Sequence, residues 1–430
     1  MQTLWHRLKA AHARIGQLLW WRPLLFCLAS ILAVFTAAWL DETLSLIGLP
    51  TISAESLRSL LQVMSSSMLV VATFAVGSMV SAYASAATTA TPRSFPLVVA
   101  DDLSQNALSG FIGAFIFSVV AQVALHNRAF GDSGRMLLFV LTCGLFALVI
   151  LLLIAWVQRI AHLGRLGNVI DRVEACTREA LERRVADPFL GGVPMVAVDA
   201  AGAGALLHAD APGYVRSVDL DALQACARSH GLRLQLLALP GVFASAVRPL
   251  LRVEGAPSPA VVKALRGAFD IGSRRDFAQD PRFGLAVLSE IACRALSPAV
   301  NDPGTAIEVL GAQLRLLSRW RSPVPGKAVV RFDRITVPAL AAQDLCEDAF
   351  LGIGRDGAGC LEVSLRLPKV LEALAASDEA DLREAAARCS GDAAERANAA
   401  LSHAPDRERI AHAAERVMAH ARDAGLSAGG

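Results

Sequence analysis

The sequence predicts an α-helical polytopic membrane bundle of four transmembrane helices, followed by a cytosolic α+β domain. Three observations support this fold class. Four long apolar runs fill the amino-terminal third of the chain, and 54% of the 430 residues are hydrophobic, more than is typical of a soluble protein. After Gly191, short apolar runs between glycines and prolines indicate strands, and helical patterns follow them.

Composition excludes some classes of protein. The formal net charge is +2, so the chain lacks the basic excess that a dedicated nucleic-acid-binding protein needs. Its eight cysteines include no pair at a CxxC spacing, and we expect small buried side chains in a reducing compartment, with no metal site and no cofactor. They are Cys27, Cys143, Cys176, Cys226, Cys293, Cys346, Cys360 and Cys389.

The chain opens with a basic arm, residues 1–22, before the first apolar run at 23–40. A cleaved signal peptide has the same order of charge and hydrophobicity, but three more spans follow, so we interpret 23–40 as a true span. Asp41, Glu42 and Glu55 come after this span without a basic partner. The excess of positive charge before the span places the amino terminus in the cytoplasm.

Three further spans are predicted at about 57–86, 103–125 and 136–158. The second run extends toward Pro92, which is about 50 Å of helix, while the hydrocarbon core is only about 30 Å thick. This helix must therefore tilt, break or leave the membrane. The fourth span ends in Arg159, His162 and Arg165, which supports a cytoplasmic carboxyl-terminal half and a multi-pass protein of the bacterial inner membrane.

A row of hydroxyls lies in the second span. Ser78, Ser81, Ser85 and Thr88 recur at helical steps and share one face, and Gln122 is a polar side chain in the third span. One interpretation is close helix packing through small residues. The other is a water-filled pathway, with these five residues as pore-lining candidates. Since no charged residue lies within a span beyond Arg58, at the very beginning of the second, a passive pathway is favoured over a pump.

The second half of the chain divides by composition into five predicted parts. These are a helical extension at 159–188, a small β-rich module at 189–256 that we expect to be barrel-like, a helical hairpin at 257–322, a strand with further helices at 323–424, and a disordered tail at 425–430.

The hairpin has a distinctive sequence. Asp280-Pro281 and Asp302-Pro303 each place a capping carboxylate before a proline, which suits the first turn of a helix. The candidate site residues of this cytosolic motif are Arg274, Asp280, Ser297, Pro298, Asn301, Asp302 and Pro303. They indicate either an anion or nucleotide pocket or a purely structural corner. Because no phosphate loop or nucleophile–base pair accompanies them, we expect no enzyme.

The same residues resemble a known family. Asp280, Phe283-Gly284, the run from Ala295 to Pro303 and Thr305-Ala306 are similar to the hallmark of bacterial predicted membrane proteins called domain of unknown function 2254. The resemblance extends from about Pro23 to about Leu374 and implies four spans and a cytosolic domain, but no activity. Gly304 departs from the bulky residue that the family often carries there.

Two functions remain open. The hydroxyl row and the absence of charged residues from the interior of the spans favour a homo-oligomeric passive channel or transporter for ions or small solutes, with a cytosolic regulatory domain. The alternative is a non-enzymatic membrane sensor or scaffold whose cytosolic domain binds an anion, a nucleotide or a protein. In both, the lipid bilayer is a partner and nucleic acid is not.

Overall fold

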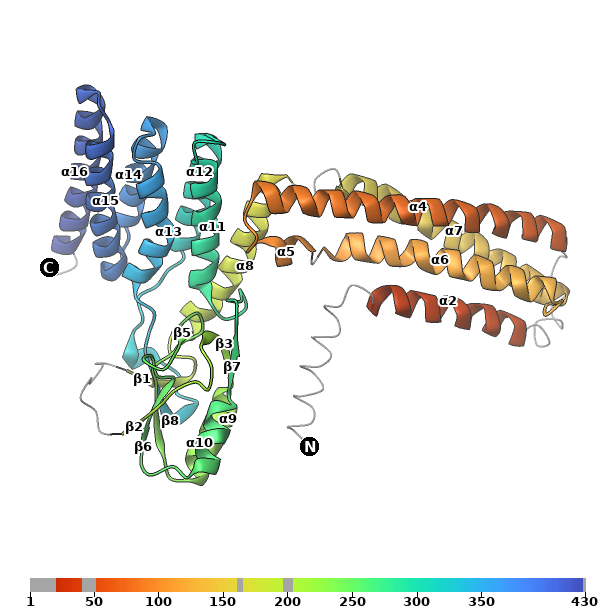
Figure 1. The fold of residues 1–430 in the computed structure, drawn as a ribbon, viewed down its shortest axis with the longest axis horizontal. Coiled ribbons are helices and arrows are strands. Elements are labelled where there is room, and N and C mark those ends of the chain that lie inside the picture. Colours follow the sequence, from red (N-terminus) through yellow and green to blue (C-terminus); the bar gives the residue numbers. More distant parts are fainter. Residues whose placement is uncertain (1–20, 41–51, 100, 161–164, 196–203, 428–430) are drawn as a thin grey trace. The chain divides into compact units, whose positions relative to one another are not determined.

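The computed structural model describes residues 21–40, 52–99, 101–160, 165–195 and 204–427 (Figure 1). The chain divides into two compact units, Met1–Val169 and Ile170–Gly430. The predicted basic arm lies outside the described residues except for Trp21 and Arg22.

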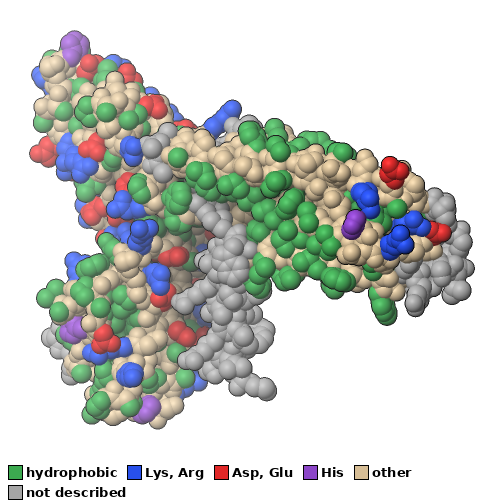
Figure 2. All heavy atoms as spheres, turned by 45° about the vertical axis from the view of Figure 1, so that its right-hand side comes forward, with side chains coloured by type: hydrophobic (Ala, Val, Ile, Leu, Met, Phe, Trp, Pro, Cys, Tyr) green, Lys and Arg blue, Asp and Glu red, His purple; other side chains and the backbone are tan. Residues whose placement is uncertain are grey.

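The first unit contains the four predicted spans as helices long and apolar enough to cross a membrane. They are α2 (Trp21–Trp39), α4 (Ala54–Thr89), α6 (Asp102–His126) and α7 (Asp132–Ile160), with the short helix α5 (Phe95–Val99) between α4 and α6. Helix α4 is longer than the predicted 57–86. In Figure 2, hydrophobic side chains cover much of the visible surface of these helices.

Helix α6 is the centre of this unit, because α2, α4 and α7 all pack against it. Its small residues allow the close approach. A Cβ added at Gly113 would lie 3.1 Å from Cβ of Phe26 in α2, and one added at Gly110 would lie 2.6 Å from a methyl carbon of Leu152 in α7. A larger residue at either glycine would therefore push neighbouring spans apart.

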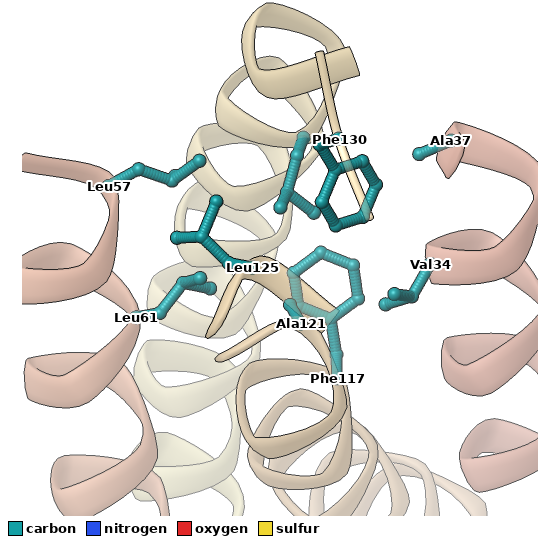
Figure 3. Packing of buried hydrophobic residues seen from close by; sticks show 9 residues of the cluster. Val34, Ala37, Leu57, Leu61, Phe117, Ala121, Leu125 and Phe130 are labelled. Carbon is teal, nitrogen blue, oxygen red and sulfur yellow. The ribbon is translucent and has the colours of Figure 1, made fainter. Parts of the chain in front are cut away.

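Figure 3 shows one part of the core, where α2, α4, α6 and Phe130 from the loop after α6 meet. Side chains from the three helices point toward one another and are almost fully buried. The cluster includes Val34, Ala37, Leu57, Leu61, Phe117, Ala121, Leu125 and Phe130. Within lipid such contacts hold helices together through close packing, since the hydrocarbon itself is already apolar.

The charged end of α6 fixes a second contact. Asp101 is 3% exposed and caps α6 by accepting hydrogen bonds from the backbone N–H of Ser104, at 3.2 Å, and from its hydroxyl. Arg159, near the end of α7, donates to the same carboxylate from Nη2 at 2.7 Å and from Nε at 3.0 Å. This buried carboxylate ties the beginning of α6 to the end of α7.

The second unit contains two sheets and a helical array. The first sheet has the order β1-β8-β4-β6-β2, formed by Gly192–Pro194, Phe332–Val337, Arg233–Leu236, Leu251–Glu254 and Ala205–Leu207. The second has the order β5-β3-β7, formed by Phe243–Ala244, Gly213–Val218 and Phe269–Gly272. The strands thus lie in two sheets, and the expected barrel-like module is wrong.

The β region also does not end at residue 256, where the sequence predicted the end of the β-rich module. Strand β8 comes from beyond the helical hairpin and lies in parallel between β1 and β4, while β7 pairs with β3. Parallel pairing of distant segments leaves no local signal in a sequence. The β region is therefore discontinuous in the chain.

The second unit contains nine helices within the described residues, of which α11 to α16 pack one upon another. The nine helices are α8 (Leu166–Ala186), α9 (Leu220–Ser229), α10 (Pro259–Arg266), α11 (Pro281–Ala295), α12 (Pro303–Leu317), α13 (Ala342–Asp356), α14 (Leu361–Ala375), α15 (Ala380–Ala400) and α16 (Ala404–Ser427). The predicted continuation of the fourth span into α8 falls on residues 161–164, outside the described residues. Helix α16 extends to Ser427, three residues into the tail predicted from residue 425.

Candidate functional site

Helix α4 has an inner face that the bundle buries. Its buried side chains recur at steps of three and four, as expected for one side of a helix, and they are Leu57, Leu61, Met64, Met68, Ala72, Ala75 and Met79. They pack against α6, where Ala107, Phe111 and Ala114 supply small and aromatic partners. The inner face is wholly apolar.

The opposite side of α4 carries what we call the outer stripe. Its members also recur at steps of three and four, and every one is exposed: Glu55, Ser59, Gln62, Ser66, Val70, Thr73, Gly77, Ser81 and Ala84. Val70 is the one large apolar member. The stripe thus runs the length of the span as a narrow row of polar and small residues that no helix of the described residues covers. Exposed apolar side chains flank it, namely Val63, Leu69, Phe74, Val76 and Val80.

The outer surfaces of the other spans are different. In α7, which is described throughout, the exposed side chains between Val140 and Val157 carry no hydroxyl, amide or charge. In α2 the exposed surface consists largely of Leu, Phe and Trp side chains. Those surfaces suit lipid, whereas the outer stripe of α4 exposes an amide and several hydroxyls at the same depth.

A hollow of about 720 Å³ lies along the carboxyl-terminal half of α4. It is lined by Phe74, Gly77, Ser78, Ser81, Ala82 and Ser85, with Ile160 at the end of α7 and Arg165 beyond it. Three of the four predicted row residues therefore share one concave surface. The side chain of Thr88, the fourth, lies outside the described part of the chain.

The depth of this row differs from the prediction. Helices α4 and α6 run antiparallel, since Leu57 shares a cluster with Leu125 and Ala75 shares another with Ala107. At about 1.5 Å per residue in both helices, the beginning of α6 is level with the turn after Met79. The last turns of α4 extend past α6, as Figure 1 shows.

Consequently Ser81 and Ser85 lie at or beyond the level of the Asp101–Arg159 ion pair, where a polar surface suits the headgroup region. Within the apolar thickness, the polar members of the outer stripe are Gln62, Ser66 and Thr73. These three were not predicted from the sequence, because the hydroxyls are densest further along α4 and the spacing alone does not show which side of α4 the bundle covers.

The hydroxyls inside the apolar thickness are bonded to their own helix. Ser66 Oγ donates to the carbonyl oxygen of Gln62 at 3.0 Å, and Thr73 Oγ1 donates to that of Leu69 at 2.8 Å. Each hydroxyl oxygen keeps lone pairs that point outward and can accept a hydrogen bond or solvate an ion.

Gln122, the remaining pore-lining candidate, lies inside the bundle. Its Nε2 donates to Oγ of Ser65 in α4 at 3.2 Å, and the side chain is half-buried. The structure therefore places it in a contact between α6 and α4 and separates it from the outer stripe.

The cytosolic motif is not one cluster. Helix α11 spans 15 residues, about 22 Å, between Asp280 at its beginning and the loop from Ser297 to Asp302 after its end. Arg274 and Asp280 lie at one end, while Ser297, Pro298, Asn301, Asp302 and Pro303 lie at the other. The single corner that the sequence suggested is wrong, because the two Asp-Pro caps begin antiparallel helices.

Each capping carboxylate accepts hydrogen bonds from within the fold. Asp280 is 2% exposed, and its carboxylate accepts from Arg275 Nε at 2.7 Å and Nη2 at 3.0 Å and from the N–H of Phe283 at 3.1 Å. Burial raises the pKa of Asp280, and the hydrogen bonds and charge of Arg275 oppose this. Gly241 has φ +96° and faces this carboxylate so closely that a side chain would collide with it.

At the other end, Asp302 accepts from the N–H of Thr305 at 3.1 Å and from its hydroxyl at 2.6 Å. These hydrogen bonds lower the pKa of Asp302. Asn301 has φ +50° and, like Pro298 and Arg274, is exposed. The geometry supports a structural role for both carboxylates.

No group of three or more His, Cys, Asp or Glu side chains that could hold a metal ion occurs within the described ranges. The outer stripe with its adjoining hollow is therefore the candidate site that the geometry supports best. Its chemistry is that of a polar surface, with hydroxyl and amide groups and no reactive pair.

Comparison with known proteins gives a family but no activity. A family model described as "Predicted membrane protein (DUF2254)" matches residues 17–373. Uncharacterized proteins of Mycobacterium bovis and Mycobacterium tuberculosis are each 30% identical over 193 residues, which is 42% of this chain and 36% of each relative. The match thus covers only 36% of the relatives' own length. No solved structure matches the chain.

Proposed function

The chain belongs to the DUF2254 family of predicted membrane proteins, and from this premise we propose that several copies assemble around the outer stripe of α4 and form a passive pathway for ions or small solutes. The observation that carries this proposal is the stripe itself. It crosses the apolar thickness as an exposed row of polar and small side chains, while the exposed surface of α7 between Val140 and Val157 is apolar and that of α2 is apolar except for Thr36.

The cost of exposing such a surface to lipid supports assembly. An amide such as Gln62 has no hydrogen-bonding partner in hydrocarbon, and polar groups at this depth face other helices or water. The small residues Gly77 and Ala84 would let helices of neighbouring copies approach closely. The simplest way to shield the outer stripe from lipid is a contact with a second copy of the chain, either directly or across a column of water.

The chemistry of the stripe favours passive movement. Between Gln62 and Ala84 it carries no ionisable group, so it offers no site at which binding a proton could drive transport. Val70 would form the narrowest apolar point, of the kind that gates by excluding water. No catalytic role forms part of the proposal.

We place both termini and the second unit in the cytoplasm of a bacterium, with the first unit in its inner membrane. The basic residues at the proposed cytoplasmic end, Arg22 and Arg159, support this orientation. The second unit would then regulate the pathway. A sensor or scaffold that binds an anion is less well supported, since Asp280, Asp302 and Arg275 are all engaged within the fold.

The proposal is tested by recording from the purified full-length protein in planar bilayers and by measuring solute flux into liposomes. We expect the unmodified protein to give channel events and Gly77→Phe to abolish them. A Cβ at Gly77 meets no atom within 4 Å, so the new ring should block the surface of the outer stripe without disturbing the packing of the chain. Leu151→Phe, on the exposed surface of α7, is the matched control and should conduct normally. Silence of the unmodified protein toward common ions and solutes would refute the pathway.

A further inference from the structure

Two free cysteines face each other in the second unit, across the contact between α13 and α15. Cys346 in α13 is completely buried, and Cys389 in α15 is half-buried. Both thiols are free, and neither belongs to the site described above.

Neighbouring contacts fix the alignment of the two helices. Arg388 Nε, next to Cys389, donates to Oε1 of Gln343, one turn before Cys346, at 2.8 Å. Further along, a Cβ added at Gly354 would lie 3.3 Å from Cβ of Ala393. Cys346 and Gly354 lie on one face of α13, and Cys389 and Ala393 lie on the facing side of α15. The two cysteines therefore belong to the same helix–helix contact.

Only one of the two thiols is within reach of a small molecule. Cys389 lines a hollow of about 360 Å³ between α13 and α15, together with Gln343, Phe350, Arg388 and Arg396. Cys346 lies behind this surface, with no exposed area. The pair thus consists of an accessible thiol with a buried thiol next to it.

Access and burial distinguish the two sulfurs. A hydrogen bond with Cys389, together with burial, raises the pKa of Cys346. Cys346 is therefore held as the protonated thiol. Oxidation by an external reagent should begin at Cys389, since the thiolate is the reactive form and access is needed.

We propose that Cys389 and Cys346 form a redox-active dithiol, which a hydroperoxide converts into a disulfide that links α13 to α15. The Cys389 thiolate attacks the peroxide, so an S–O bond forms, the O–O bond breaks, and an alkoxide or hydroxide leaves, which takes up the proton released by the Cys389 thiol and becomes an alcohol or water. The sulfur of Cys346 then attacks that of Cys389. The S–S bond forms, the S–O bond breaks, and the leaving hydroxide takes up the Cys346 proton as water.

The test treats the purified full-length protein with hydrogen peroxide and analyses it by mass spectrometry without reduction. We expect the intact protein to lose two hydrogen atoms and a digest to contain a peptide pair joined through Cys346 and Cys389, which a thiol reductant separates. Cys346→Ser should stop the reaction at a sulfenic acid on Cys389, which a dimedone probe traps. Cys389→Ser should abolish both products.

Cys293→Ser is the control, because the Cys293 thiol is half-buried beside Ser289 and Asp356 and should not affect the linked peptide. Cys346→Ala provides a second variant in case serine is not tolerated at this buried position. A linked peptide that persists in Cys389→Ser, or peroxide treatment that gives sulfenic acid on Cys389 without any disulfide, would overturn the proposal.

Discussion

The two sides of α4 belong to one helix but have opposite surfaces. The inner face, from Leu57 to Met79, is apolar and buried against α6, whereas the outer stripe, from Glu55 to Ala84, is polar or small and exposed. Both follow the same helical repeat and both extend through the membrane. Packing against α6 explains why the inner face is apolar, but no contact within the described chain explains why the outer stripe is polar.

The contacts between the described helices of the first unit form its core, but they leave polar side chains of α4 exposed at membrane depth. The lipid-facing helices α2 and α7 have the exposed apolar side chains that a bilayer requires. Within the described spans, α4 presents an exposed amide, Gln62, and a row of exposed hydroxyls that are bonded to their own helix, whereas α2 exposes the single hydroxyl of Thr36. Substitutions on the two sides of α4 should therefore have separable effects, on stability for the inner face and on conduction for the outer stripe.

The largest expected effect is on the inner face. Leu61→Ala removes a completely buried side chain from the contact with α6 and should lower the free energy of unfolding by about 3 kcal/mol. Ser59→Ala, its exposed neighbour, should change it by less than about 0.5 kcal/mol. Denaturant titration in detergent compares them. Equal effects would remove the distinction between the two sides.

A second prediction concerns the apolar member of the outer stripe. Val70 is 68% exposed, and Val70→Ser should increase conduction by on the order of tenfold, because it removes the apolar narrowing. Val140→Ser, at a 53% exposed valine of α7, is the matched control and should leave conduction unchanged. Both variants should unfold like the unmodified protein. An increase in the control alone would place the pathway elsewhere.

A third prediction concerns the stability that a helix-capping carboxylate contributes in the second unit. Asp302→Ala removes the cap of α12 in the second unit and should cost about 1 kcal/mol at neutral pH. Since hydrogen bonds from Thr305 lower the pKa of Asp302 from 3.8, the unfolded chain binds the proton more readily, and the stabilisation is lost as the pH falls below that value.

The difference between Asp302→Ala and the unmodified protein should therefore shrink in acid. Unfolding curves recorded at neutral pH and at several pH values down to below 3.8 measure this difference in unfolding free energy. A difference that stays constant would mean that the charge of Asp302 does not contribute to the cap.

The smallest effect is expected at Gln122, which the structure places in the bundle. Gln122→Leu removes the hydrogen bond to Ser65 and should cost about 0.6 kcal/mol, the average for such bonds between membrane helices. Conduction should not change. A loss of conduction without a loss of stability would move Gln122 into the pathway and weaken the contrast between the two sides of α4.

The sequence predicted much of the fold. Four spans follow from uninterrupted apolar runs, and both Asp-Pro caps begin helices, because these signals are local. Long-range pairing was not predictable, so the place of β8 between β1 and β4 was missed. The two caps were also expected at one corner, although the length of α11 separates them.

The candidate site was predicted only in part. The hydroxyl row of α4 was identified from its helical spacing, and three of its members do line one hollow. Its depth and its flanking surface depend on how α6 aligns with α4, which requires coordinates. In that alignment Gln62, Ser66 and Thr73 lie within the apolar thickness, whereas Ser81 and Ser85 lie at its edge or beyond it.

The most direct test of this account measures water at the outer stripe. Thr73→Cys, introduced into protein that lacks its other cysteines, would be treated in liposomes with a charged thiol reagent that does not enter lipid. The natural Cys143, exposed on α7, retained as the sole cysteine in a parallel protein, reports the lipid-facing surface. We predict rapid modification at residue 73 and none at Cys143; equal protection of both positions would contradict a hydrated pathway along α4.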